Sequence, residues 1–271
     1  MALTDLPGGR RLHYEAIEGP AGGAVLVFLH EGLGCAAMWK GFPRALCGAS
    51  GLPGLVYDRT GFGRSSPATV LRTPRYLHDS ALEELPAVLE RTIPGRDYIL
   101  VGHSDGGSIA LIHAASRPRK LRAVVAEAAH VMVEPITLRG IEAAVEAWRA
   151  GRFAGLARYH GSRAETVFRA WADAWMDPAF HGWNIEDELR DITCPVLALQ
   201  GTEDPYGSPA QVEAIRSKVP NGRGVMLEGR GHAPHRERPE KTLKIMRGFI
   251  LENAAPAAGD DRVSPSRGAQ S

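Results

Sequence analysis

Gly102-His103-Ser104-Asp105-Gly106-Gly107 is the stretch that decides the fold, and it has the form G-x-S-x-G. It follows a buried-strand pattern, DYILV, and precedes a helical one, SIALIHAAS. The strand-to-helix turn of this motif is so sharp that small residues are needed on either side of the serine, and it holds the hydroxyl above the sheet. We therefore predict that Ser104 is a nucleophile. The alternative is a serine N-cap in a glycine-rich turn.

Short apolar runs alternate with helical patterns on both sides of this motif. Such alternation is typical of a sheet with parallel strands and crossover helices, so the predicted fold class is α/β with a mostly parallel, doubly wound sheet. The predicted strands are Ala24–His30, Gly54–Arg59, Tyr98–His103, Leu121–Ala128, Val196–Gly201 and Val225–Glu228. The predicted crossover helices are Tyr76–Arg91, Ser108–Ser116, Ser208–Lys218 and Pro239–Leu251. Arg11–Ile17 alternates in polarity and is expected to pair at an edge.

The alternation stops between Glu134 and Asp187, where helical periodicity continues without a strand candidate. We predict a helical cap at residues 134–187, inserted between core segments 1–133 and 188–253 and folded over the strand ends as a lid. Its tryptophans include three candidates to line a pocket, although aromatic stripes at helical spacing more often pack in a core: Trp148, Trp171 and Trp175. Residues 254–271 have the composition of a disordered tail.

A serine hydroxyl is a weak nucleophile unless a base takes its proton and a carboxylate orients that base. In a doubly wound sheet, reactive groups lie beyond the carboxyl ends of the strands. His232 follows the last predicted strand and Asp204 follows the one before it, so we predict these two as base and acid. The alternatives are His235 as the base and Glu203 or Glu127 as the acid.

The chain order Ser104, Asp204, His232 and two further motifs resemble the α/β-hydrolase superfamily. Tyr57–Ser65 (YDRTGFGRS) is similar to its Y/D-D-x-x-G-x-G-x-S segment, and Leu29–Gly34 (LHEGLG) is similar to its H-G-x-x-G loop. The match covers almost the whole chain before the tail. The resemblance implies a serine hydrolase with a Ser-His-Asp triad, without cofactor or metal, that cleaves an ester or related carbonyl bond of a small molecule.

Other chemistry remains open on this scaffold. Carbon–carbon bond hydrolysis, lactone or amide hydrolysis and cofactor-free perhydrolysis are the alternatives within enzymes. A ligand receptor built on a hydrolase scaffold is the alternative outside them.

In hydrolases of this superfamily the loop after the first buried strand donates one backbone N–H to the oxyanion hole. The second donor is the residue after the nucleophile, here Asp105. Direct alignment makes Gly32 the first donor, and Leu33 takes its place if Glu31, where the family has glycine, is an inserted residue. We expect Gly32.

The Asp105 side chain is unusual, because a carboxylate beside the nucleophile does not help a site that stabilises an oxyanion. It either caps the helix or pairs with an arginine such as Arg59, or it binds a cationic substrate group together with Glu31. G-x-S-D-G-G resembles the turn of valacyclovirase-like hydrolases, which cleave esters of α-amino acids. We expect the structural role for Asp105, with Glu31 and Leu33 as further candidates for substrate contact.

The composition sets the remaining expectations. The 271 residues carry 32 Lys+Arg against 31 Asp+Glu, which offers no field for nucleic acid or anionic lipid. Cys35, Cys47 and Cys194 lack metal spacing and are expected to be buried small residues. No apolar run has the length of a signal or membrane span, so a cytoplasmic protein is expected. A homo-oligomer remains open.

Overall fold

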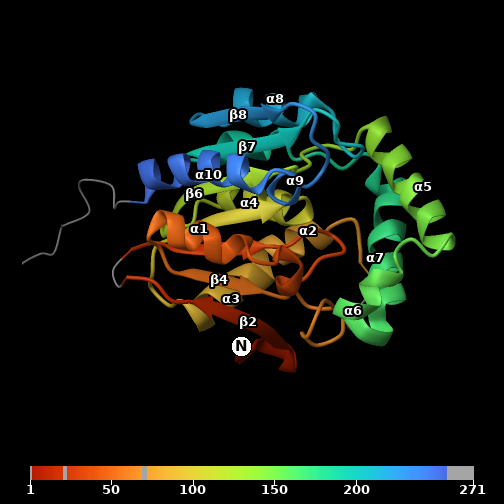
Figure 1. The fold of residues 1–271 in the computed structure, drawn as a ribbon, viewed down its shortest axis with the longest axis horizontal. Helices are drawn as coiled ribbons and strands as arrows, with labels where there is room; N and C mark the ends of the chain where they lie inside the picture. Colours follow the sequence, from red (N-terminus) through yellow and green to blue (C-terminus); the bar gives the residue numbers. More distant parts are fainter. Residues whose placement is uncertain (1, 21–22, 69–71, 255–271) are drawn as a thin grey trace, which may run out of the picture.

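The computed structural model describes residues 2–20, 23–68 and 72–254 (Figure 1). Eight strands form one sheet in the order β1-β2-β4-β3-β5-β6-β7-β8. β2 pairs antiparallel with β1 and β4, and all other pairs are parallel. The strands are β1 Ala2–Asp5, β2 Arg11–Ile17, β3 Val25–Leu29, β4 Gly54–Tyr57, β5 Tyr98–His103, β6 Leu121–Glu127, β7 Val196–Gly201 and β8 Gly222–Leu227.

Helices cover both faces of this sheet, as Figure 1 shows. Val25 and Val27 of β3 belong to one apolar core, and Leu26 and Phe28 belong to the other, because successive side chains of a strand point to opposite faces. α1 and α10 pack into the second core, whereas α3, α4 and α8 pack into the first. The helices are α1 Phe42–Ser50, α2 Tyr76–Asp79, α3 Leu85–Thr92, α4 Asp105–Ala115, α5 Pro135–Arg149, α6 Ala157–His160, α7 Ala164–Met176, α8 Pro209–Lys218, α9 Pro234–Glu237 and α10 Pro239–Asn253.

The predicted α/β class is confirmed, and three local expectations are wrong. β1 forms the edge beyond Arg11–Ile17, and its exposed or half-exposed residues carry no sign of burial in the sequence. β8 begins at Gly222, three residues earlier than predicted, because its first residues are polar or glycine and only partly covered. The predicted helix Tyr76–Arg91 is divided into α2 and α3 by a π-helical turn at Ser80–Glu84.

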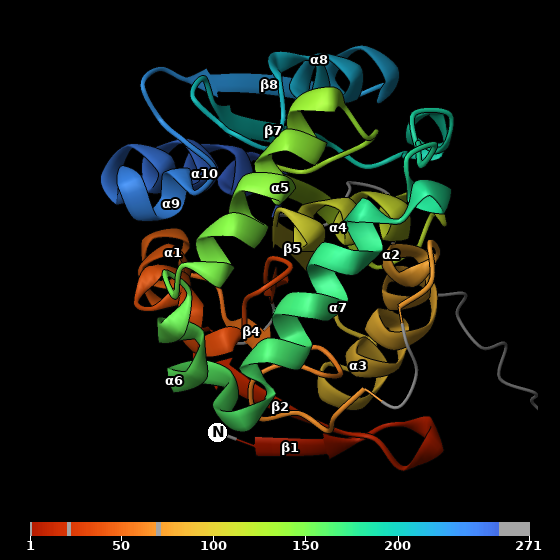
Figure 2. The same ribbon diagram turned by 90° about the vertical axis from the view of Figure 1, so that its right-hand side faces the viewer.

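Residues 134–187 fold as α5, α6 and α7 with short helical turns between them. Met132 and Asn184 form an isolated bridge, so the two ends of this segment lie side by side. Figure 2 shows α5 and α7 crossing in front of the sheet. Their side chains line the same cavity as Ser104, which follows the carboxyl end of β5. The segment therefore covers the strand ends at which the nucleophile lies.

Three further expectations concern burial and the chain ends. Cys35 and Cys47 are buried and Cys194 is half-buried, all as free thiols. Within the described residues, no helix is long and apolar enough to cross a membrane. The tail expected at 254–271 lies, apart from Ala254, outside the residues that the structure describes.

Candidate active site

Ser104 lies at the turn between β5 and α4 with φ 54° and ψ −119°, a backbone conformation that residues other than glycine rarely adopt. The surrounding glycines make this turn sterically feasible. A Cβ atom on Gly102 would lie 2.2 Å from the Gly106 carbonyl oxygen, and one on Gly106 would lie 2.0 Å from the carbonyl oxygen of Leu29. The motif therefore needs glycine at both positions because β3, β5 and α4 approach too closely for a methyl group.

The structure brings Ser104, His232 and Asp204 into one hydrogen-bonded chain. The Ser104 hydroxyl donates to Nε2 of His232 over 2.9 Å. His232 Nδ1–H in turn donates to the two carboxylate oxygens of Asp204 over 2.9 and 2.8 Å. Asp204 also accepts the backbone N–H of Tyr206 over 2.9 Å, which fixes the carboxylate on the loop after β7.

Burial and the neighbouring charges shift the pKa values of His232 and Asp204 in opposite directions. Burial alone would lower the pKa of His232, but the hydrogen bond and charge of Asp204, with the charges of Glu31 and Glu127, raise it overall. Burial alone would raise the pKa of Asp204, but the hydrogen bond and charge of His232, with the Tyr206 N–H and the charge of His130, together lower it overall. The pair thus favours an ionised carboxylate that stabilises the imidazolium formed when His232 takes a proton.

The loop after β3 carries the backbone N–H groups of Gly32 and Leu33, of which only the second has a hydrogen-bond partner among the described residues. The Leu33 N–H donates to the Glu31 carboxylate over 2.5 Å. Among the hydrogen bonds of the described residues, none uses the N–H of Gly32 or of Asp105. A Cβ atom on Gly32 would lie 2.3 Å from the Trp171 indole, so only glycine fits below that ring. Within the described residues, the N–H groups of Gly32 and Asp105 therefore remain without a hydrogen-bond partner.

The Asp105 side chain is fully buried and faces a cation and a phenol. Its Oδ2 accepts the Tyr76 hydroxyl over 3.0 Å and lies 3.8 Å from the Arg59 guanidinium. Its Oδ1 has no hydrogen-bond partner within the described part of the chain. The pairing with Arg59 is the structural arrangement expected from the sequence, and Asp105 is also one of the residues around the cavity.

A cavity of about 170 Å³ opens above Ser104 and His232. Of the predicted contact residues, Glu31, Leu33, Trp171 and Trp175 line it. Trp148 is not among its lining residues, because its ring stacks on Phe168 inside the cap at a centroid distance of 4.3 Å. The sequence did not single out six other lining residues, which come from separate segments of the chain: His130, Thr137, Phe153, Tyr206, Ala233 and Arg236.

The alternative base and one alternative acid are paired with each other. His235 Nδ1–H and the His235 backbone N–H each donate to the Glu127 carboxylate over 2.7 Å. Both side chains are buried and neither contacts Ser104. Glu203, the other alternative acid, is exposed, and its N–H donates to the Arg230 carbonyl. None of these three side chains is hydrogen-bonded to Ser104 or to His232, and Glu127 meets Ser104 only through its backbone carbonyl, which accepts the Ser104 N–H over 2.9 Å.

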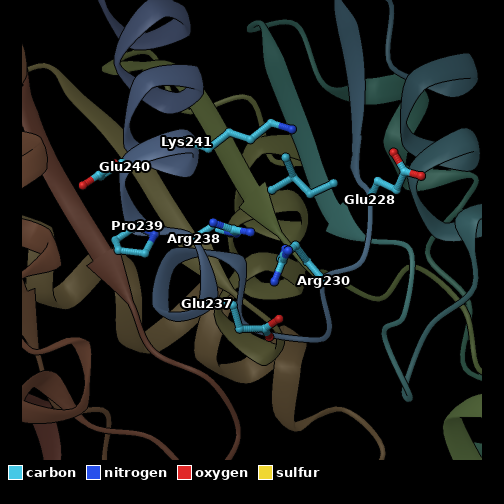
Figure 3. A pocket seen from close by; sticks show the side chains of 8 residues that line it. Glu228, Arg230, Glu237, Arg238, Pro239, Glu240 and Lys241 are labelled. Atoms are coloured by element: carbon cyan, nitrogen blue, oxygen red, sulfur yellow. The ribbon is translucent and has the colours of Figure 1, made fainter.

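A larger hollow of about 430 Å³ lies between the end of β8 and the start of α10 (Figure 3). Figure 3 shows its charged lining, with Arg230 on the loop after β8, Glu237 on α9 and Arg238 and Lys241 at the start of α10. Ser104 and His232 are not among its lining residues, and no cysteine or serine lines it. The smaller cavity is therefore the one that combines a nucleophile, a base and free N–H donors.

The chain matches a family model described as "Alpha/beta hydrolase family" over residues 26–245. It is 28% identical to the polyketide synthase ThaQ of Burkholderia thailandensis over 95% of this chain, although it spans only 13% of that protein. It is 25% identical to a proline iminopeptidase of Lactobacillus delbrueckii subsp. bulgaricus, over 93% of this chain and 99% of that protein. The structure of a membrane phospholipase A, described as a bacterial virulence factor, matches with a TM-score of 0.76 at 23% identity, covering 92% of this chain and 84% of that one. Because the family model spans most of its length, the chain belongs to the alpha/beta hydrolase family.

Proposed function

We propose that this chain is a cofactor-independent serine hydrolase that cleaves a carboxylic ester, or a related carbonyl bond, of a small molecule. The observation that carries the proposal is the continuous chain of hydrogen bonds from Ser104 through His232 to Asp204 at the floor of the cavity. A hydroxyl at 2.9 Å from a carboxylate-oriented imidazole is the arrangement that activates a serine.

The proposed reaction has two steps on one acyl-enzyme. Ser104 attacks the carbonyl carbon while His232 Nε2 takes the hydroxyl proton, and the N–H groups of Gly32 and Asp105 bind the tetrahedral oxyanion. His232 returns the proton to the leaving alkoxide. Water, activated by His232 in the same way, then releases the acid and restores the serine.

Active-site labelling and turnover test this proposal directly. A fluorophosphonate should label Ser104 in the wild type, and the modified peptide should be identified by mass spectrometry. A series of p-nitrophenyl esters of graded acyl length should show multiple turnovers, which Ser104→Ala should abolish without loss of the folded state. Turnover unchanged in Ser104→Ala would contradict the assignment, and a single turnover followed by arrest would favour a ligand receptor.

A second candidate, hydrolysis of an ester or amide of an α-amino acid, is favoured by Glu31. Its carboxylate lines the cavity, and within the described residues no Lys or Arg side chain forms an ion pair with it. Burial raises the pKa of Glu31, so a cationic group beside it would stabilise its charged form. Trp171 and Tyr206 add aromatic walls, which also favour a cation. Similarity to a proline iminopeptidase agrees with this substrate class.

Paired substrates separate the two candidates. The p-nitrophenyl esters of alanine and propionic acid differ in the ammonium group, whose charge-assisted hydrogen bond contributes about 1.5–3 kcal/mol. The alanine ester should therefore be preferred roughly ten- to hundredfold in kcat/KM. Glu31→Gln should reduce this ratio if Glu31 binds the ammonium, whereas Asp105→Asn tests the same role for Asp105. Equal losses on both esters in Asp105→Asn would support its structural pairing with Arg59.

A further inference from the structure

The loop that carries His232 is held by side chains from two other strands. His103 at the end of β5 donates Nε2–H to the His232 carbonyl over 2.8 Å. His103 is the residue directly before Ser104, so this hydrogen bond joins the nucleophile turn to the histidine loop. Nε2 must carry the hydrogen, because the carbonyl oxygen can only accept. Burial and the neighbouring His235 and His232 hold the pKa of His103 well below its usual value, which favours the neutral ring.

Glu127 at the end of β6 holds the same loop three residues further on. Both of its carboxylate oxygens accept hydrogen bonds from His235, one from the backbone and one from the ring. Glu127 is fully buried, and among the described residues its only ion-pair partner is His235. On the outer side of the loop, Glu237 accepts the N–H groups of Gly231 and Ala233 over 2.7 and 3.1 Å.

The environment of His232 contains several charged or titratable groups besides Glu127. They come from every element packed against its ring: Asp204 and Tyr206 after β7, Glu31 after β3, His103 on β5, His130 after β6, and Arg236 on α9. Three carboxylates, those of Asp204, Glu31 and Glu127, favour the imidazolium form of His232. Of these three, only Glu127 lies away from both the cavity wall and the hydrogen-bonded chain.

We propose that His103, Glu127 and His235 form a positioning network, which fixes the His232 loop and adds the charge of the buried Glu127 carboxylate to those of Asp204 and Glu31 around the His232 imidazole. The inference rests on the proposed serine-hydrolase function. His103 and His235 restrain the backbone before and after Ala233, so that His232 reaches Ser104 and Asp204 together. Glu127 adds charge without touching substrate, and it is a positioning residue.

The same three side chains also have the composition of a metal site, since their ligand atoms lie within 4.8 Å of one another. Their hydrogen bonds favour the positioning role. His103 Nε2 is taken by the His232 carbonyl, and both Glu127 oxygens are taken by His235. A metal ion bound through these atoms would compete with the bonds that hold the loop.

The test uses the rate at which a fluorophosphonate labels Ser104, measured between about pH 5 and 8, because this rate reports the state of His232 without any assumed substrate. Glu127→Gln removes the charge, while its amide can still accept from the His235 backbone and donate to the other tautomer of the ring. The acid limb of the labelling profile should move to lower pH in this variant. Glu127→Asp keeps the charge and should leave the limb nearer to that of the wild type.

Glu84→Gln is the matched control, since Glu84 is another buried carboxylate that binds a backbone N–H, that of Thr60, and does not face His232. Its labelling profile should keep the acid limb of the wild type. An acid limb unchanged in Glu127→Gln would overturn the charge role. If the limb shifted equally in Glu84→Gln, a general loss of stability would explain it and the proposal would be wrong.

Variants of His103 test the positioning role separately from the charge role. They also keep the proposal testable if Glu127→Gln does not fold. His103→Leu removes the donor to the His232 carbonyl and should slow labelling by up to roughly 100-fold, since a small misplacement of a catalytic group has effects of this size. His103→Gln restores a donor and should recover part of the rate. Equal rates in His103→Leu and the wild type would overturn the proposal. A wild type that is not labelled at all would overturn the proposed function itself, whereas a labelled wild type with unchanged variants would overturn only this inference.

Discussion

The molecule contains two similar histidine–carboxylate pairs, His232 with Asp204 and His235 with Glu127. The two histidines lie three residues apart in one segment, whereas their carboxylates come from different strand ends. In both, Nδ1 faces a carboxylate oxygen, at 2.8 Å in the first pair and 2.7 Å in the second. The pairs differ in what surrounds the rest of the ring. The His232 side chain is 19% exposed and its Nε2 reaches Ser104, whereas His235 is 3% exposed and its ring packs against Trp39 at 4.7 Å.

This comparison shows that the pair alone does not define a general base. In the mechanism that we propose, the same two functional groups support proton transfer where the second nitrogen meets a hydroxyl at a cavity. In the second pair, the His235 ring is enclosed by aromatic side chains, and Glu127 binds both this ring and the His235 backbone N–H. A buried pair is costly to break, because removing one partner leaves an uncompensated charge or an unsatisfied donor.

The largest expected effects on kcat and on stability come from replacing each of the two histidines, separately, by alanine. His232→Ala should reduce kcat by on the order of 10⁴- to 10⁶-fold, since members of a triad act as a unit, and should leave the fold intact. His235→Ala should instead lower the free energy of unfolding by about 3–5 kcal/mol, because the buried Glu127 loses its partner. Activity assays and urea denaturation of both variants check this reversal. A greater loss of kcat in folded His235→Ala than in His232→Ala would mean that the two roles are assigned the wrong way round.

Replacing the two carboxylates should also affect the reaction rate unequally, with the larger loss at Asp204, but the difference should be smaller than that between the two histidines. Asp204→Asn leaves a hydrogen-bonding group of the same shape but favours the wrong His232 tautomer, which should reduce kcat by roughly 10⁴-fold. Asp204 touches the reacting histidine directly, and Glu127 acts only through position and charge. Single-turnover acylation rates for Asp204→Asn and Glu127→Gln should therefore rank in that order. Equal rates for the two variants would remove the distinction between the pairs.

The smallest expected effect is the position of the acid limb in the wild type. His232 must be neutral to accept the Ser104 proton, and its pKa is raised above the ordinary value of 6.5. Accordingly, kcat/KM should rise with pH through a midpoint above 6.5 and then reach a plateau. The measurement is kcat/KM for a p-nitrophenyl ester, corrected for spontaneous hydrolysis. A midpoint below 6.5 would indicate that burial of His232 dominates over its three neighbouring carboxylates.

Much of the fold could be predicted from the sequence, because buried parallel strands are continuous apolar runs and the nucleophile turn is a local motif. The interior strands β5 and β7 begin and end where the pattern places them. The edges could not be predicted in the same way. β1 and the start of β8 are paired on one side only and exposed, so their residues carry no apolar signal.

The residues of the candidate site likewise fall into those that the sequence predicts and those that only the packing reveals. Ser104, Asp204 and His232 follow strand ends, which sequence order identifies. The partnership of Glu127 with His235 joins residues 108 positions apart, and no local pattern encodes it. Trp148 shows a related limit: helical spacing places Trp148 and Trp171 in apolar stripes, but only the packing of α5 against α7 decides which ring stacks on Phe168 and which one faces the cavity.

The close approach of Gly106 to the Leu29 carbonyl has a consequence for how this protein can diverge. The nucleophile turn has no room for a single added methyl group, so almost any substitution at its glycines displaces a strand or a helix of the core. Much of the cavity roof comes from α5 and α7, which belong to the segment inserted between β6 and β7 and lie outside the sheet. Substitutions can therefore accumulate in the roof while the turn below stays unchanged, and related sequences should vary most at the positions of α5 and α7 that line the cavity.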